Sequence, residues 1–236
     1  MKTLSKFRLT LRYNNKLNPK IWINDSLKEN VASKLKLIAS KWAKYANIPK
    51  EAIRDIILVG GNANYNYTRY SDIDLHLVVD KQLIANCPDL LDDYLRDKKQ
   101  LWSLTHDIEI YGHNVELYAQ STEDPYPKGQ GVYSIKDKKW IIKPKKENIN
   151  FNKDPFLAKK IKFMMDQIDY LIDNNADEDE FVKLKEKLRD MRAAAIQRGG
   201  EFSFENLIFK DLRNRGYLDK ISEYIRRSED ERLSVK

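Results

Sequence analysis

Apolar residues recur along the first half of the chain with two different periods. They return every three or four positions over 27–45 and 89–104, which predicts two amphipathic helices. Short apolar runs bounded by turn residues predict strands at about 55–60, 72–79, 107–111 and 115–120. Gly112-His113-Asn114 is expected to turn the last two strands into a hairpin, and a second hairpin is expected over 131–143. The pattern therefore predicts an α/β head.

The second half of the chain has a helical period. Apolar stripes over 157–171 and 181–195 predict two long helices, and Gly199-Gly200 is expected to end the second. Two shorter helices are expected to follow, one ending near Gly216 and one over about 217–227.

Two capping signals support these helices. Asp177 and Glu180 have the spacing of a capping box, and Ser203 is expected to cap the helix that follows it. The change of period predicts two parts, a head at residues 1–147 and a helical C-terminal region at residues 148–236. The first residues, at about 7–13, alternate in polarity and allow a short strand or an extended arm.

Two aspartates separated by one residue are the most informative feature of the head. Asp72 and Asp74 lie in an apolar run, and Gly60-Gly61 ends another apolar run upstream. Alternate side chains of a strand share a face, so the two carboxylates are expected to lie roughly 6–7 Å apart. Such a pair can hold two Mg²⁺ ions about 3.5–4 Å apart. The alternative interpretation is a polar stripe on a half-exposed strand.

Strand, Gly-Gly, loop and Asp-x-Asp in this order resemble the signature of the nucleotidyltransferase superfamily, most closely small enzymes predicted in phage genomes. Further stretches carry the resemblance: 18–22, 63–67, 70–76, 115–118, 131–134, 139–141 and 199–203. The resemblance implies a small mixed-sheet head with a helical tail. It also implies transfer of NMP from an NTP to an acceptor hydroxyl, with release of pyrophosphate.

The resemblance also assigns the site. It implies that Asp72, Asp74 and a third carboxylate hold two Mg²⁺ ions, or Mn²⁺ in their place. The third acid is expected to be Glu116, which follows a turn between apolar residues, with Glu109 one strand earlier as the alternative. For either glutamate, the alternative interpretation is a solvated residue on an edge strand.

The nucleotide is expected to lie at the Gly-Gly loop. The expected nucleotide-binding residues are Gly60, Gly61, Asn62, Arg69 and Ser71. Many members of the superfamily have Gly-Ser at this point, and Gly-Gly moves phosphate binding onto backbone N–H groups. Arg69 is a candidate for triphosphate oxygens, whereas Ser71 also reads as a residue that turns the chain into the strand.

The histidines and the single cysteine add little chemistry. His76 continues the aspartate stripe, where a packed histidine is the preferred interpretation over a group behind the metal ligands, and His106 and His113 receive no role. Cys87 is the single cysteine, which suits a reducing cytosol and predicts a cytoplasmic protein, in the host cytoplasm if a phage encodes it. No stretch approaches the ~18 apolar residues of a membrane helix.

The charge balance bears on the acceptor. The 236 residues carry a net charge of +7, with a pI of about 9.2, which favours a polyanionic partner. Six lysines with Trp140 among them, over 136–146, resemble a nucleic-acid contact, although lysine runs are usually solvated faces. RNA, such as a tRNA 3′ end, is therefore the first choice of acceptor. The alternatives are a protein or small-molecule hydroxyl, or a binding module without activity.

Overall fold

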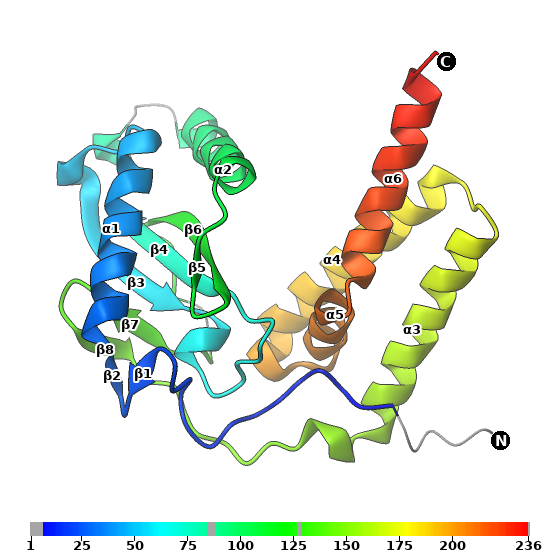
Figure 1. Ribbon diagram of the computed structural model, residues 1–236, viewed down its shortest axis with the longest axis horizontal. Helices are drawn as coiled ribbons and strands as arrows, with labels where there is room; N and C mark the ends of the chain where they lie inside the picture. The colour runs from blue at the N-terminus through cyan, green and yellow to red at the C-terminus, as the bar shows by residue number, and fades with distance from the viewer. Residues whose placement is uncertain (1–6, 85–87, 127–128, 236) are drawn as a thin grey trace. The chain divides into compact units, whose positions relative to one another are not determined.

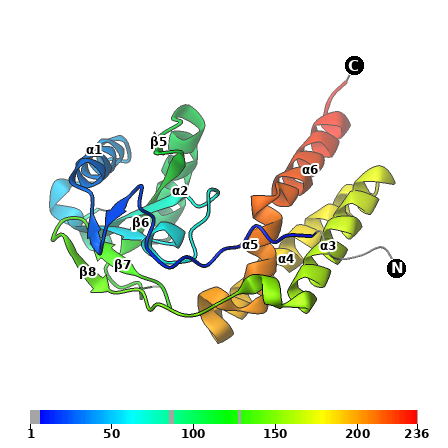
Figure 2. The ribbon, with the colours of Figure 1, turned by 60° about the horizontal axis from the view of Figure 1, so that its bottom comes forward.

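The computed structural model describes residues 7–84, 88–126 and 129–235, and Cys87 lies outside them (Figure 1 and Figure 2). The described residues form two compact units. The head comprises residues 13–148, and the helical unit comprises residues 149–235 together with residues 7–12. Sheet and helices are both present, so the predicted α/β (α+β) class with a mixed sheet is confirmed.

A six-stranded mixed sheet forms the centre of the head. Its strands are β3 (Ile53–Val59), β4 (Ile73–Val79), β5 (Glu109–Ile110), β6 (His113–Ser121), β7 (Val132–Ser134) and β8 (Lys139–Ile142). They lie in the order β5-β6-β4-β3-β7-β8. The neighbours β4 and β6 are parallel, whereas the other neighbouring pairs are antiparallel. This order puts β4, the strand of Asp74, between β3 and β6.

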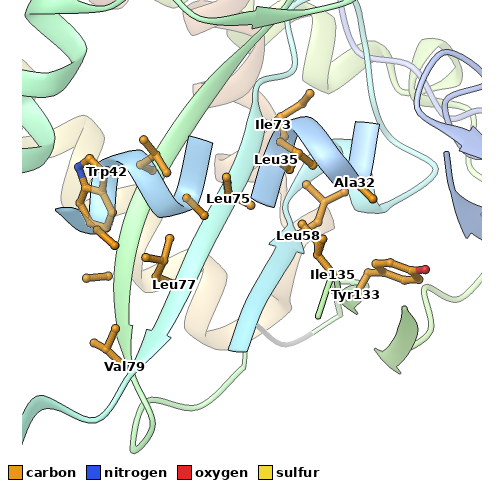
Figure 3. Packing of buried hydrophobic residues seen from close by; sticks show 14 of the residues in the cluster. Ala32, Leu35, Trp42, Leu58, Ile73, Leu75, Leu77, Val79, Tyr133 and Ile135 are labelled. Atoms are coloured by element: carbon orange, nitrogen blue, oxygen red, sulfur yellow. The ribbon is translucent and has the colours of Figure 1, made fainter. Parts of the chain in front are cut away.

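Helices α1 (Glu29–Tyr45) and α2 (Pro88–Thr105) complete the head, with a small strand pair, β1 (Trp22–Ile23) and β2 (Ser26–Leu27). Helix α1 lies across one face of the sheet, and Figure 3 shows Leu35 and Trp42 facing Leu75 and Leu77. All four side chains are fully buried. Because alternate residues of a strand face opposite ways, this packing leaves Asp74 on the other face of the sheet.

The turn of the β5–β6 hairpin begins one residue earlier than the sequence predicted. Tyr111 and Gly112 both have positive φ, at 53° and 77°, which is the conformation of a two-residue type I′ turn. Glu109 and Ile110 therefore pair with Asn114 and His113. His113 belongs to the strand and is buried, instead of lying in the turn.

Four helices form most of the second unit: α3 (Pro155–Asp173), α4 (Glu178–Gly199), α5 (Phe204–Asn214) and α6 (Tyr217–Leu233). Two predicted caps are wrong in detail. Asp177 and Ser203 occupy the N-cap positions of α4 and α5, but neither side chain makes a capping hydrogen bond. Asp154 caps α3 instead, where its Oδ1 accepts hydrogen bonds from the N–H groups of Phe156 and Leu157.

Residues 7–12 form an extended arm without a strand, and they pack on the helical unit instead of the head. The Thr10 N–H and hydroxyl both donate to Asp211 Oδ2, at 2.7 and 2.9 Å. Asp211 is fully buried and also accepts a hydrogen bond from Arg215. The sequence placed this arm in the head because its partner lies about 200 residues further along the chain.

Candidate functional site

The Gly-Gly turn lies directly against Asp74. Val59, the last residue of β3, pairs with Asp74 of β4, and Gly60 follows with φ 73°. A Cβ atom built on Gly60 would lie 1.6 Å from Asp74 Oδ2. The backbone conformation therefore requires glycine at this position, and a Cβ atom would also displace the Asp74 carboxylate. The turn continues as a short 3₁₀ helix, Gly61–Ala63, which carries the backbone toward the loop.

The sheet places Glu116 beside Asp74. These two residues are direct partners in the parallel β4–β6 pair, so their side chains project from the same face of strands about 4.8 Å apart. Asp72 immediately precedes β4. Glu109 lies on β5, which is separated from β4 by β6. The register therefore brings Glu116 beside Asp74, whereas Glu109 stays at the edge of the sheet.

A lysine that sequence reasoning missed engages Glu116. Lys99 of α2 places its Nζ 3.4 Å from Glu116 Oε2, and both side chains are partly exposed. Such a pair contributes no more than about 1 kcal/mol. Within the described ranges, no three acidic, histidine or cysteine side chains converge as a metal site. Asp74 and Glu116 nevertheless offer the oxygen donors that Mg²⁺ prefers.

A buried amide positions Asp72 from behind. The Asn62 side chain is fully buried, and its Nδ2 donates to the carbonyl oxygens of Ser71, at 3.1 Å, and Asp72, at 2.9 Å. Its Oδ1 accepts from Asn18 Nδ2 at 2.9 Å. These three bonds use both donors of Asn62, so the residue holds the Gly-Gly turn against the start of β4. In this structure it supports the site and is not free to contact a nucleotide.

His113 extends this network, although the sequence gave it no role. Its Nδ1 lies 2.6 Å from the Ser71 carbonyl oxygen, and its Nε2 lies 3.0 Å from Asn18 Nδ2. The carbonyl needs a donor and the amide nitrogen needs an acceptor, so the ring is the neutral tautomer that carries its proton on Nδ1. The sequence could have indicated this role only through the correct position of the hairpin turn, because a turn at Tyr111-Gly112 places His113 in the strand with its side chain buried.

His76 is also a packed histidine. Its Nδ1 bonds Gln120 Oε1 at 2.9 Å across the β4–β6 pair, and its ring lies 5.0 Å from that of Tyr118. Burial lowers the pKa of His76, because the charged ring would lose solvation, and the nearby Lys99 ammonium lowers this pKa further. The neutral ring is therefore favoured in the folded head.

The loop before β4 is organised by its own side chains. The Arg69 guanidinium lies over the Tyr70 ring, 4.6 Å from its centroid, and donates a hydrogen bond to its hydroxyl. Ser71 Oγ accepts from the Thr68 N–H at 2.9 Å, which stabilises the turn into the strand. Arg69 is exposed and remains a candidate for phosphate, whereas Ser71 is partly occupied by the turn.

The lysine segment is largely tied to the head. Lys138 pairs with Glu29 at 2.9 Å, and Lys143 pairs with Asp25 at 2.5 Å. The Trp140 ring stacks on Trp22 with centroids 4.8 Å apart. One face of the Trp140 ring is therefore covered by Trp22. Only the opposite face could stack on a nucleic-acid base.

A pocket of about 450 Å³ adjoins Lys99 on the outer side of β6. Its lining includes three cations, Lys81, Arg96 and Lys99, and two carboxylates, Asp92 and Asp124. Lys81 forms an ion pair at 2.5 Å with Asp92, which also lines the pocket. Arg96 pairs with Asp93 at 2.6 Å and Lys99 pairs with Glu116, so each cation of the lining already has a carboxylate partner.

Comparisons with known proteins add little to this geometry. No protein-family model matches the chain, and no curated protein matches it. Among solved structures, the STING-associated CdnE c-di-GMP synthase from Capnocytophaga granulosa shows 16% identity and a TM-score of 0.23. The alignment covers 85% of this chain and 81% of that chain. At this TM-score the likeness supports no inference about fold or activity. In the described ranges, no helix is both long and apolar enough to cross a membrane.

We predict that Asn62→Asp destabilises the head by about 3 kcal/mol, because a carboxylate would face two carbonyl oxygens in a buried site. Urea unfolding followed by tryptophan fluorescence measures this change, since Trp22, Trp42, Trp102 and Trp140 all lie in the head. The matched control is Asn15→Asp at an exposed position, with an expected change within about 0.5 kcal/mol. If Asn62→Asp lowers the free energy of unfolding no more than the control does, the hydrogen bonds of Asn62 do not stabilise the head.

The lowered pKa of His76 predicts a loss of stability in acid. The unfolded residue takes up a proton as pH falls through about 6.5, whereas the folded residue resists protonation. Stability from this group is therefore complete above about pH 6.5 and declines as pH falls toward the folded pKa. Between pH 7.5 and 5.5, His76→Gln should reduce the change of the urea midpoint with pH. The control His106→Gln, at an exposed histidine, should leave that change as it is in the wild type. Parallel pH profiles for His76→Gln and the wild type would contradict this assignment.

Proposed function

We propose that this protein is a Mg²⁺-dependent nucleotidyltransferase that moves NMP from an NTP to an acceptor hydroxyl. One observation carries the proposal. A glycine turn with no room for a side chain lies against Asp74, and Asp74 is in register with Glu116 on the neighbouring strand. A close backbone approach beside paired carboxylates is what a metal-bound triphosphate requires.

The residues have separate roles in this proposal. Asp72, Asp74 and Glu116 would hold the divalent cations, which when bound neutralise the triphosphate and polarise the acceptor hydroxyl. The backbone N–H groups at Gly60 and Gly61 would donate hydrogen bonds to phosphate oxygens. The acceptor oxygen forms a bond to the α-phosphorus, and the bond to the bridging oxygen breaks. Pyrophosphate leaves with that electron pair, and Glu116 takes the hydroxyl proton.

RNA remains the proposed acceptor, supported by the net charge of +7. The lysine segment supports it less than the sequence suggested, because Lys138 and Lys143 are paired and Trp140 is stacked. The pocket beside Lys99 adds little support, because its cations are paired with carboxylates and Asp92 and Asp124 also line it. A protein or small-molecule hydroxyl is the alternative acceptor within the same reaction.

A specific observation favours a second candidate, a binding module without activity. Glu116 is engaged by Lys99, and the three acids do not converge in the described residues. An active enzyme requires Glu116 to exchange this weak ion pair for the cation site. A retired head would keep the pair and bind NTP or RNA without turnover.

Transfer from each α-³²P-labelled NTP to total RNA tests the proposal, with Mg²⁺ present or replaced by EDTA. Label is expected in RNA, and Asp74→Asn should lower the rate by at least about a hundredfold through lost charge stabilisation. Label on protein instead would identify a protein acceptor. Bound NTP without transfer to any acceptor would support the retired module.

The third carboxylate has a matched control in the same hairpin. Glu116→Gln should abolish transfer, whereas Glu109→Gln on β5 should leave it within about twofold, because β5 does not contact β4. A similar loss in both variants would contradict the roles assigned from the register.

Lys99→Met is predicted to strengthen divalent-cation binding by up to about fivefold, because it removes the ammonium that competes for Glu116. Titration of free Mn²⁺ by electron paramagnetic resonance measures this without any turnover. Lys98→Met is the control, since the Lys98 ammonium lies over the rings of Tyr45 and Tyr94 instead. Equal affinities for both variants and the wild type would show that Lys99 does not restrain Glu116.

A further inference from the structure

Helix α3 carries an exposed aromatic stripe. Phe156, Phe163 and Tyr170 keep 75%, 58% and 66% of their surface exposed. Their seven-residue spacing returns each ring to nearly the same direction, with a drift of about 20° per repeat. The opposite side of the helix is buried in the helical unit through Leu157, Ile161, Met164 and Ile168. Three solvent-exposed aromatic rings in one line indicate an interaction surface.

Charges along this stripe change sign at Phe163. On α3, Lys159, Lys160 and Lys162 precede it, whereas Asp166, Asp169 and Asp173 follow it. On a helix, Lys159 and Asp166 lie on the same side of the aromatic line, separated by seven residues. Neither Lys159 nor Asp173 forms an ion pair with another described residue, and Asp166 binds only its helical neighbour Lys162, at 2.8 Å. The stripe thus has a basic end and an acidic end.

We propose that α3 is a self-association surface on which two copies of the chain pair their α3 helices in antiparallel orientation about Phe163. Phe163 then meets Phe163 of the second copy, and Phe156 meets Tyr170 of the second copy. In a two-fold antiparallel pair, residues on one side of the seam meet residues on the same side of the partner. Lys159 of each copy therefore meets Asp166 of the other.

Charge decides in favour of a second copy. A nucleic acid or an anionic membrane would meet Asp166 and Asp173 over half of the stripe, and both carboxylates would repel phosphate groups. A reversed copy of the same helix matches both ends at once. This surface lies on the helical unit, so the inference does not depend on the proposed transferase activity.

The size of the surface sets the strength of the pairing. Helix α3 has 19 residues, which gives a length of about 28 Å. A single helix pair buries less than the roughly 1,200 Å² of a standard interface, so a reversible dimer is expected at micromolar concentration. Sedimentation velocity across that range should show a monomer–dimer equilibrium.

Cysteine cross-linking of the full chain tests the geometry, in a Cys87→Ser background. With copper phenanthroline as oxidant, Phe163→Cys should form a covalent dimer with itself. Phe156→Cys and Tyr170→Cys should each cross-link poorly alone but efficiently when the two variants are mixed. Self-cross-linking at all three positions would indicate a parallel pair, and no cross-linking at any position would indicate no pair; either result overturns the proposal.

Charge exchange gives a second, independent readout. Lys159→Glu and Asp166→Lys should each weaken the dimer by about tenfold, and the double variant should recover to within about threefold of the wild type. Lys187→Glu, at an exposed position on α4, is the control and should leave the dimer unchanged. Failure of the double variant to recover, or a protein that stays monomeric and binds single-stranded RNA through Phe163, would overturn the proposal.

Discussion

The fully bonded Asn62 side chain is the constraint on which the head depends. It ties the 3₁₀ turn after β3 to the carbonyl groups that open β4, and through Asn18 it ties both to the N-terminal segment. The Trp22 indole N–H closes the same region by donating to the Asn62 carbonyl at 2.7 Å. A buried network of this kind is stable only when every donor finds an acceptor. The position of Asp72 is therefore fixed by groups that never face solvent.

The two faces of strand β4 have different roles. Ile73, Leu75 and Leu77 are fully buried beneath α1, while Asp74 and His76 between them face the other way. The alternation lets a single strand anchor the core and present a carboxylate without conflict between the two tasks. On the polar face, Gly60 supplies the space for Asp74 and β6 supplies Glu116 as its lateral neighbour. The chemistry of the site is thus set by register, and register is set by the buried face.

The periods of apolar residues were enough to predict the main helices and strands, because these signals are local. Features that depend on distant partners were not predictable. His113 was left without a role because Asn18 and Ser71 reach it from other parts of the chain. Lys99 was missed because α2 must first pack beside β6. The capping box at Asp177 failed for the opposite reason, since a correct local spacing does not force the side chain to turn toward the backbone.

The arm at residues 7–12 also orders events during synthesis. Its partner Asp211 emerges about 200 residues after Thr10, which at ribosomal speeds of about 5–20 residues per second is a delay of about 10–40 s. The head, residues 13–148, is complete well before then. This arm is therefore among the last parts of the helical unit to dock, and its buried leucines Leu9 and Leu11 spend that interval without their native cover. A nascent chain with this layout offers a short apolar segment to chaperones until residue 211 has emerged.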